Sequence, residues 1–180
     1  MKINKTYIED LLIIEPQLFK DERGFFYESY NKTKFDKIIN IVFVQDNESK
    51  SNKGVIRGLH FQKPPFEQTK LVRCVSGKIL DVVVDIRTNS KTYGKSFSIE
   101  LSSKNNKQLF VPKGFAHGFQ VISDEAIVNY KVDEYYNPDL DSGIIWNDKD
   151  LSIAWNLDLK PILSEKDLKL DLFKNLKSPF

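Results

Sequence analysis

Residues 71–87 read LVRCVSGKILDVVVDIR, and they carry the clearest structural signal in the chain. Residues 71–75 and 79–87 are rich in β-branched and other apolar residues, which favour strands. Ser76-Gly77-Lys78 between them has the composition of a tight turn. The stretch therefore predicts two strands joined as a hairpin, and it indicates a β protein.

Similar short runs occur on both sides of this stretch, separated by turn signals about every ten residues, as in sandwiches and barrels. We expect further strands at 11–14, 25–30, 41–45, 55–61, 97–101, 108–111, 118–122 and 126–132. Helical patterns occur only at 32–39 and at 165–176, where Ser164 is a suitable N-cap. The pattern predicts an all-β jelly-roll barrel with short peripheral helices.

The composition fits one domain spanning residues 1–180, since the chain is long enough to bury a full core. Hydrophobic residues make up 41% of the sequence and aromatic residues 12%, as in globular proteins. The net charge of +2 comes from 27 basic and 25 acidic residues that are mixed along the chain. Because no basic stripe is present, nucleic acid is not an expected partner.

The sequence also predicts no membrane association and a cytoplasmic location. No apolar run approaches the roughly 20 residues that a spanning helix requires. The first residues, MKINK, lack the apolar stretch of a signal peptide. The single cysteine, Cys74, excludes an intramolecular disulfide and a cysteine-based zinc site, and its strand context predicts a small buried side chain.

The chain has only two histidines, and both lie in glycine-containing segments. His60 belongs to RGLHFQ at 57–62, and His117 belongs to PKGFAHG at 112–118. Imidazole suits both metal binding and proton transfer near neutral pH. The pair therefore raises two alternatives, a metal site and an acid–base site.

The metal alternative rests on a resemblance to the two motifs of the cupin superfamily. The first motif matches Gly54, His60 and Glu67, and the second matches the segment 112–117. Metal-binding cupins have a second histidine where this chain has Gln62. Transition metals usually take three or four nitrogen, oxygen or sulfur ligands, so this set falls short and we expect no bound metal.

The acid–base alternative needs a carboxylate to orient the base, a cation to stabilise a carbanion and an acid to return the proton. Lys70 follows His60 by one predicted strand, Tyr130 lies in another strand, and carboxylates occur at Asp81, Asp85 and Asp167. The required side-chain types are thus present, although the spacing does not show that they meet.

Eight motifs, in order along residues 19–167, closely resemble the dTDP-4-dehydrorhamnose 3,5-epimerase family of metal-free cupins. They are DERGFF at 21–26, VQDN at 44–47, RGLHFQ at 57–62, KLVRCVSG at 70–77, DVVVDIR at 81–87, PKGFAHGF at 112–119, YYNP at 135–138 and PILSEKD at 161–167. Each motif alone is modest evidence, whereas eight colinear motifs are specific.

The resemblance implies a role for each matching residue. His60 matches the general base, Asp167 its orienting carboxylate, and Tyr130 the acid on the opposite face of the sugar. Lys70 matches the cation beside the enolate, and His117, partnered by Asp81, a second imidazole near the carbonyl. The substrate-binding positions implied are Arg23, Glu28, Gln45, Asp46, Asn47, Arg57, Lys70, His117, Asp141 and Lys166.

Two positions depart from the family pattern: Glu48 replaces a histidine that often follows the QDN triplet, and Asp141 replaces a glutamate. Structural alternatives also stay open. Asp167 stands three residues after Ser164, where an acid favours a helix start, and Tyr135 and Tyr136 are rival acids. Other site residues have ordinary alternatives as packed core side chains, strand lysines or surface ion pairs: His60, Lys70, His117, Tyr130, Arg23 and Arg57.

The implied function is epimerisation of a dTDP-linked 4-keto-6-deoxyhexose at C3 and C5, without a cofactor, by a homodimer. Two alternatives remain. The nearer one is an epimerase acting at one carbon or on another nucleotide sugar. The more distant one is a sugar-nucleotide binding module or a metal-binding cupin without this activity.

Overall fold

The computed structural model describes residues 1–180 and consists of strands with two four-residue helices and one 3-10 helix, which confirms the all-β prediction. The strands are β1 (Lys2–Lys5), β2 (Leu12–Glu15), β3 (Phe19–Asp21), β4 (Gly24–Phe26), β5 (Gln45–Asn52), β6 (Ile56–Gln62), β7 (Lys70–Ser76), β8 (Lys78–Asp85), β9 (Ser96–Ser102), β10 (Gln108–Val111), β11 (Phe115–Val121), β12 (Glu125–Val132) and β13 (Asp141–Gly143). The helices are α1 (Lys32–Phe35), α2 (Glu165–Leu168) and the 3-10 helix η1 (Phe173–Asn175).

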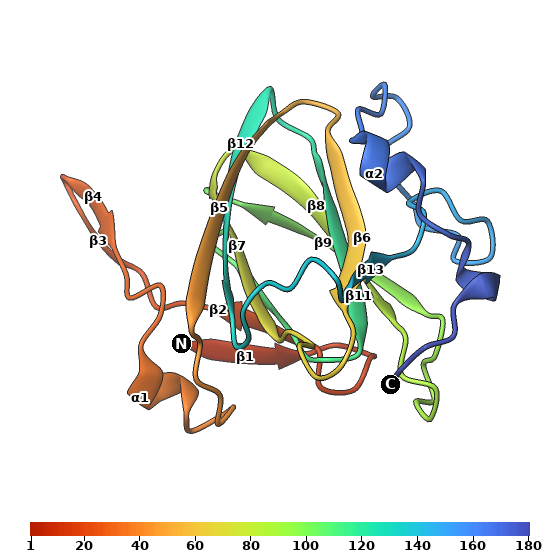
Figure 1. The fold of residues 1–180 in the computed structure, drawn as a ribbon. Coiled ribbons are helices and arrows are strands. Elements are labelled where there is room, and N and C mark those ends of the chain that lie inside the picture. Colours follow the sequence, from red (N-terminus) through yellow and green to blue (C-terminus); the bar gives the residue numbers. More distant parts are fainter.

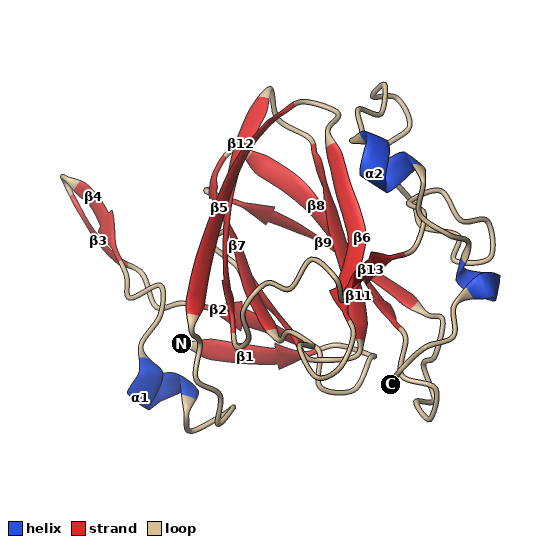
Figure 2. Ribbon diagram, in the orientation of Figure 1, coloured by secondary structure: helices blue, strands red, loops and turns tan.

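Two antiparallel sheets face each other and form the barrel (Figure 1). The six-stranded sheet has the order β1-β2-β10-β7-β12-β5, and the five-stranded sheet has the order β13-β6-β11-β8-β9. Strands β3 and β4 form a separate hairpin that projects away from both sheets. The helices lie outside the barrel, with α1 and α2 on opposite sides (Figure 2).

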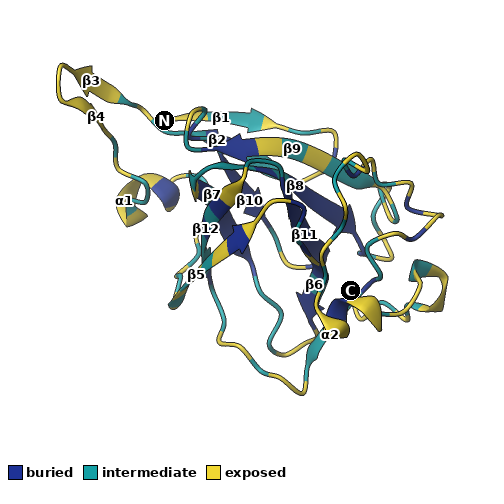
Figure 3. Cartoon of the chain, turned by 90° about the horizontal axis from the view of Figure 1, so that it is seen from above, coloured by how far each residue is buried: buried dark blue, intermediate teal, exposed yellow.

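Three hydrophobic clusters hold the layers together. The largest contains 14 buried residues, most of them from strands of the two sheets, among them Val72 and Val83. A second cluster of 10 packs the outer face of the five-stranded sheet against the C-terminal segment, including Trp155. A third, smaller cluster packs Phe35 of α1 onto the six-stranded sheet. Burial is therefore concentrated in the barrel, while the β3–β4 hairpin is exposed (Figure 3).

The prediction of a hairpin at 71–87 is correct in its strands and turn but wrong in its pairing. Strand β7 pairs with β10 and β12, whereas β8 pairs with β9 and β11 in the opposite sheet. At the turn, Gly77 has φ +78°, and a Cβ there would lie 2.1 Å from the carbonyl oxygen of Glu125. The chain crosses between sheets at this close approach, so that the apolar faces of both strands enter the same core.

Two other predicted strands were wrong. Residues 41–44 have no regular structure, and strand β5 begins at Gln45 instead. Ile41 and Phe43 pack against the third cluster, on the outside of the sheet. In the 25–30 stretch only Phe25 and Phe26 are in a strand, as part of the projecting hairpin.

The predicted helix at 165–176 is interrupted. Ser164 caps α2 as expected, since its hydroxyl accepts a hydrogen bond from the Asp167 N–H at 3.1 Å. Beyond α2, the carbonyl of Asp171 accepts from the Ile145 N–H, and the Asp148 carboxylate accepts from the Phe173 N–H. Backbone groups that a longer helix would use internally are thus bonded to the rest of the protein. Similarly, helix α1 ends at Phe35, short of the predicted 39.

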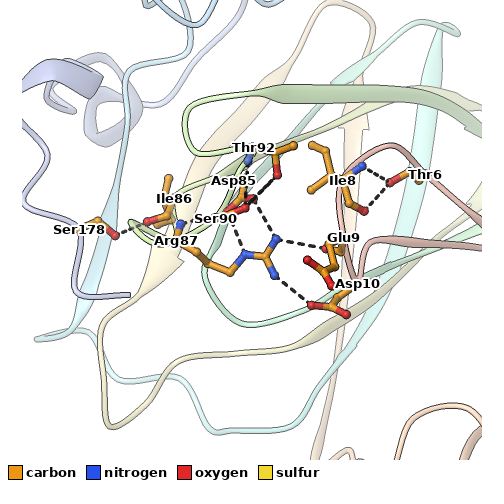
Figure 4. A network of polar contacts seen from close by, with 10 residues as sticks. All are labelled: Thr6, Ile8, Glu9, Asp10, Asp85, Ile86, Arg87, Ser90, Thr92 and Ser178. Carbon is orange, nitrogen blue, oxygen red and sulfur yellow. Dashed lines mark hydrogen bonds and ion pairs between the residues drawn. The ribbon is translucent and has the colours of Figure 1, made fainter.

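A polar network fixes the end of β8 (Figure 4). The buried Asp85 carboxylate accepts hydrogen bonds from Arg87, Ser90 and Thr92 at 2.6–2.9 Å. Arg87 also contacts Asp10 at 3.1 Å and lies over the Phe115 ring. The network therefore ties the loop after β8 to the N-terminal segment and to the start of β11.

Candidate active site

A cavity of about 560 Å³ is lined by residues of strands β5, β6, β7, β11 and β12 and of helix α2. Both predicted histidines face it, together with residues from the six-stranded sheet and from the segment 162–167. Its lining residues are Asn47, Glu48, Ser49, Val55, Ile56, Arg57, His60, Lys70, His117, Gly118, Phe119, Tyr130, Ile162, Leu163, Ser164, Lys166 and Asp167. The fold thus brings six of the predicted site regions to one pocket, although they are far apart in sequence.

His60 and Asp167 form the first polar pair of the pocket. Nε2 of His60 lies 2.6 Å from Oδ1 of Asp167, and the carboxylate is nearly buried. Burial raises the pKa of Asp167, but hydrogen bonds from His60 and from the Gly58 backbone outweigh it, so the pKa lies below its usual range. The carboxylate is therefore charged at neutral pH, and it orients an imidazole whose Nδ1 has no protein partner.

The segment that carries Asp167 is held against the barrel by backbone hydrogen bonds. The N–H of Ile56 donates to the carbonyl of Ile162 at 2.9 Å, and the N–H of Ile162 donates to the carbonyl of Gly54 at 3.0 Å. The segment is thus attached to the start of β6, the strand that carries His60. Both the helix-start role and the orienting role considered for Asp167 are compatible, because Ser164 bonds its N–H and His60 bonds its carboxylate.

His117 and Asp81 form a second, deeper pair. Their contact is 2.8 Å from Nε2 to Oδ1, and both residues are buried. His117 lies directly opposite His60 in the register between β11 and β6. Gly58 and Gly118 allow these strands to approach closely, since a Cβ on Gly58 would lie 2.6 Å from the Cα of Gly118. Two carboxylate-paired imidazoles therefore stand side by side on one wall.

Lys70 and Tyr130 lie on the opposite wall, on neighbouring strands β7 and β12. Burial lowers the pKa of Lys70 to about 8, although the negative charges of Asp141 and Asp81 act to raise it. Burial raises the pKa of Tyr130, although the positive charge of Arg57 acts to lower it. The wall facing the histidines thus presents a cationic donor and a protonated phenol at neutral pH.

The rival tyrosines lie elsewhere. Tyr135 is 59% exposed and Tyr136 is 55% exposed, and neither lines the cavity. The Tyr136 hydroxyl donates to Asp141 at 2.9 Å, and Lys166 pairs with the same carboxylate oxygen. Asp141 therefore links the loop after β12 to helix α2 beside the pocket, while Tyr130 is the tyrosine that lines it.

Of the predicted substrate-binding residues, Asn47 and Arg57 also line the cavity, whereas several others do not. Gln45 lies two residues from Asn47 along β5 and donates to its side chain at 2.8 Å. Asp46 is exposed and pairs with Lys131. Arg23 and Glu28 lie in and just after the projecting hairpin, paired with Asp21 and Lys34 respectively, and contribute nothing to this cavity.

The sequence reasoning missed two polar residues in β5, Ser49 and Ser51. Ser49 lines the cavity, and its buried hydroxyl has no hydrogen-bond partner. The Ser51 hydroxyl accepts a hydrogen bond from Nε of Arg57 at 3.0 Å. Alternation along β5 could have indicated both, had Gln45 been taken as the first residue of a strand.

The donor set does not suit the metal alternative. Both polar atoms of Gln62 bond to backbone groups of Phe66, Tyr135 and Asn137, so this side chain joins two loops. Glu67 pairs with Lys113 at 3.5 Å. No group of three or more histidine, cysteine, aspartate or glutamate side chains is placed to hold a metal ion.

Comparison with known proteins identifies the family. The family model described as dTDP-4-dehydrorhamnose 3,5-epimerase matches residues 5–175. The chain belongs to this family. Its members are epimerases, that is, isomerases, and the resemblance inferred from eight motifs is confirmed.

Individual relatives extend over nearly the whole chain. The dTDP-4-dehydrorhamnose 3,5-epimerase of Escherichia coli (strain K12) is 52% identical over 172 residues, which is 94% of this chain and 93% of that protein. The crystal structure of the enzyme of that name from Elizabethkingia anophelis NUHP1 superposes with a TM-score of 0.92 at 50% identity, covering 99% of this chain and 98% of that one.

A third relative has a sugar nucleotide bound. It is the dTDP-6-deoxy-D-glucose-3,5-epimerase from Legionella pneumophila Philadelphia 1 in complex with dTDP-4-keto-L-rhamnose, with a TM-score of 0.93 and 45% identity, covering 98% of this chain and 94% of that one. The shared fold confirms the cupin-type jelly roll.

No helix in this chain is long and apolar enough to cross a bilayer.

Proposed function

We propose that this pocket epimerises dTDP-4-dehydro-6-deoxy-D-glucose at C3 and C5, giving dTDP-4-dehydro-L-rhamnose, as a step of dTDP-L-rhamnose biosynthesis. One observation carries the proposal: a carboxylate-oriented imidazole, His60, and a partly buried phenol, Tyr130, line opposite walls of one cavity. Inversion of a carbon centre requires removal of a proton from one face and delivery to the other. Two facing acid–base groups satisfy that requirement.

The chemistry follows from the 4-keto group, which acidifies the protons on C3 and C5. Nδ1 of His60 takes the proton, and the electrons of the broken C–H bond form the C=C bond of an enolate whose negative charge rests on O4. Lys70 and the His117–Asp81 pair stabilise that oxygen. Tyr130 then protonates the same carbon from the opposite face, and both groups regain their starting protonation by exchange with water.

Substrate binding is assigned to the other polar groups around the cavity. Arg57 and Lys166 suit the diphosphate, since arginine can bind two of its oxygens at once and lysine supplies a point charge. Asn47 offers an amide, held by Gln45, and Asp141 positions Lys166. For Asp46 a substrate contact stays a prediction, because its side chain pairs with Lys131 outside the cavity.

A homodimer would explain the positions of Arg23 and Glu28. The hairpin that carries Arg23 projects from the barrel and exposes Phe19, Phe25 and Phe26. Exposed apolar residues on a projecting element are typical of a surface that contacts another subunit. We propose that this hairpin reaches the pocket of a second copy and that Arg23 and Glu28 bind nucleotide there. The cytoplasmic location stays a prediction.

The test is incubation with dTDP-4-dehydro-6-deoxy-D-glucose in deuterated water, with the label located by NMR. We expect deuterium at both C3 and C5. His60→Ala should abolish exchange at both carbons, because it removes the proposed base, and the neighbouring His117 is buried and bonded to Asp81. Retained exchange in that variant, or a requirement for a chelatable metal, would contradict the mechanism.

Tyr130→Phe separates the two proton transfers. His60 remains, so deprotonation and loss of the original proton should continue, while net epimerisation at C5 falls well below wild type. Tyr135→Phe is the matched control, because its exposed ring lies outside the cavity, and it should epimerise normally. Label at a single carbon in the wild type would instead indicate the single-site alternative, and binding without any exchange would indicate a binding module.

A further inference from the structure

The Arg57 guanidinium is held by a hydroxyl rather than by a carboxylate. It lines the cavity from β6 and is exposed, yet no carboxylate forms an ion pair with it. By contrast, Arg23 and Arg87 each pair with an aspartate. The one hydrogen-bond partner of the Arg57 side chain is the Ser51 hydroxyl, which accepts from Nε at 3.0 Å. Its terminal nitrogens, Nη1 and Nη2, therefore remain available as donors.

Ser51 is a fixed acceptor. It is only 6% exposed and lies near the end of β5, where it pairs with Ala126 of β12 in the antiparallel ladder. Arg57 lies near the start of β6, and the short connection between the two strands is closed by a hydrogen bond from Val55 N–H to Asn52 carbonyl at 3.2 Å. The serine thus connects the six-stranded sheet to an arginine of the five-stranded sheet.

We infer that Ser51 is a positioning residue, which orients the Arg57 guanidinium so that both terminal nitrogens face the diphosphate of the bound nucleotide sugar. The inference rests on the proposed function. A free arginine side chain loses much rotamer freedom on binding, and a guanidinium held in advance loses less. Because the partner of Nε is a neutral hydroxyl, the full positive charge of Arg57 remains available to the phosphates. An aspartate in place of Ser51 would neutralise that charge.

The orientation also matters for the acid. The charge of Arg57 opposes the rise that burial causes in the pKa of Tyr130. A guanidinium that moved away from the wall would therefore leave the phenol a weaker acid. Through one hydrogen bond, Ser51 therefore affects both the binding of the diphosphate and the acidity of Tyr130.

The experiment compares Ser51→Ala with the wild type, using dTDP alone as the binding probe in calorimetry and the full substrate for kinetics. We expect Ser51→Ala to weaken dTDP binding and to raise KM by about three- to tenfold, with a smaller fall in kcat. Ser51→Thr keeps the hydroxyl and should stay near wild type, whereas Ser51→Val, which is isosteric with the threonine variant but lacks the hydroxyl, should behave like Ser51→Ala. Ser98→Ala, an exposed serine on β9, is the matched control and should change nothing.

A double-mutant cycle distinguishes positioning from a general structural role. In an Arg57→Ala background, Ser51→Ala should have no further effect on dTDP affinity. An equal loss in both backgrounds, or wild-type affinity in Ser51→Ala and Ser51→Val, would overturn the inference. If Ser51→Ala unfolds, the Thr–Val pair supplies the same comparison. A wild-type protein that neither binds dTDP nor turns over substrate would instead contradict the proposed function, so the two failures are separable.

Discussion

Lys70 carries a charge in the pocket at a cost to stability. Burial lowers its pKa from 10.5 to about 8, which corresponds to roughly 3 kcal/mol of unfavourable charging at neutral pH. We expect Lys70→Met to lose epimerase activity, because the enolate oxygen loses its cation. The same variant should unfold at higher denaturant concentration than the wild type at pH 7, since methionine fills a similar volume without a charge.

The pH dependence of that difference follows from the two protonation states. Unfolded Lys70 holds its proton to about pH 10, whereas the folded residue releases it near pH 8. The penalty on the wild type is therefore complete below pH 8 and fades as the pH rises towards 10. Urea unfolding at pH 7 and pH 10 measures it; a stabilisation that did not shrink with pH would show that the charge is not its cause. Lys63→Met, at an exposed position, is the control.

At the scale of elements, the sequence predicted most strands well, but it missed β5, one of the strands that line the pocket. The strands at 71–75 and 79–87 could be predicted because most of their side chains are apolar and buried. The same pattern does not specify which strand each one pairs with. Strand β5 was missed because Asn47 and Ser49 line the cavity rather than the core, and Ser51 is also polar, so that no hydrophobic period marks the strand.

For the candidate site too, the sequence indicated the residue types but not which residues meet. The sequence supplied suitable residue types, but His60 and Asp167 are 107 positions apart, and no local pattern links them. Only the resemblance connected them before the structure placed them in contact. Arg57 could be named in the same way, whereas its partner Ser51 could not, because a serine in a polar stretch carries no signal of its own.

The Asp85 network permits a prediction about an element (Figure 4). In Arg87→Met, the fully buried Asp85 carboxylate keeps Ser90 and Thr92 but loses its only cation. Breaking a buried pair from one side costs about 3–5 kcal/mol, and we expect a loss towards the lower end because Arg87 is partly exposed. Adding Asp85→Asn should recover part of it. Lys91→Met, in the same loop and exposed, should unfold like the wild type.

The stabilisation that the Asp85 network provides depends on pH in the acid range. Burial raises the pKa of Asp85, but hydrogen bonds from Arg87, Ser90 and Thr92 outweigh it, so the folded pKa lies below its usual range. The stabilisation by the network is therefore complete above the unfolded pKa of about 4 and is lost as the pH falls through the lower, folded value. The difference between wild type and Arg87→Met should narrow in acid, and a constant difference from pH 7 downwards would contradict this account.

At the scale of the whole molecule, the projecting hairpin predicts how two defective variants behave when mixed. Arg23 lies on β3–β4, away from the cavity of its own chain. Suppose that it completes the pocket of a second copy. A dimer of one Arg23→Ala chain and one His60→Ala chain then contains one intact pocket, formed by the His60 of the first chain and the Arg23 of the second. Each variant alone has none.

We therefore expect the two purified variants, each with reduced activity, to regain activity when they are mixed and allowed to exchange subunits. With random exchange of equal amounts, half of the dimers are mixed and each has one wild-type pocket, so recovery should approach one quarter of wild-type activity per chain. Mixing His60→Ala with Lys70→Met is the control, because both residues line the same pocket of one chain and no mixed dimer contains an intact site. Full activity of Arg23→Ala alone would remove the hairpin from binding. Reduced activity without recovery on mixing, after mass spectrometry has shown subunit exchange, would mean that Arg23 serves the pocket of its own chain.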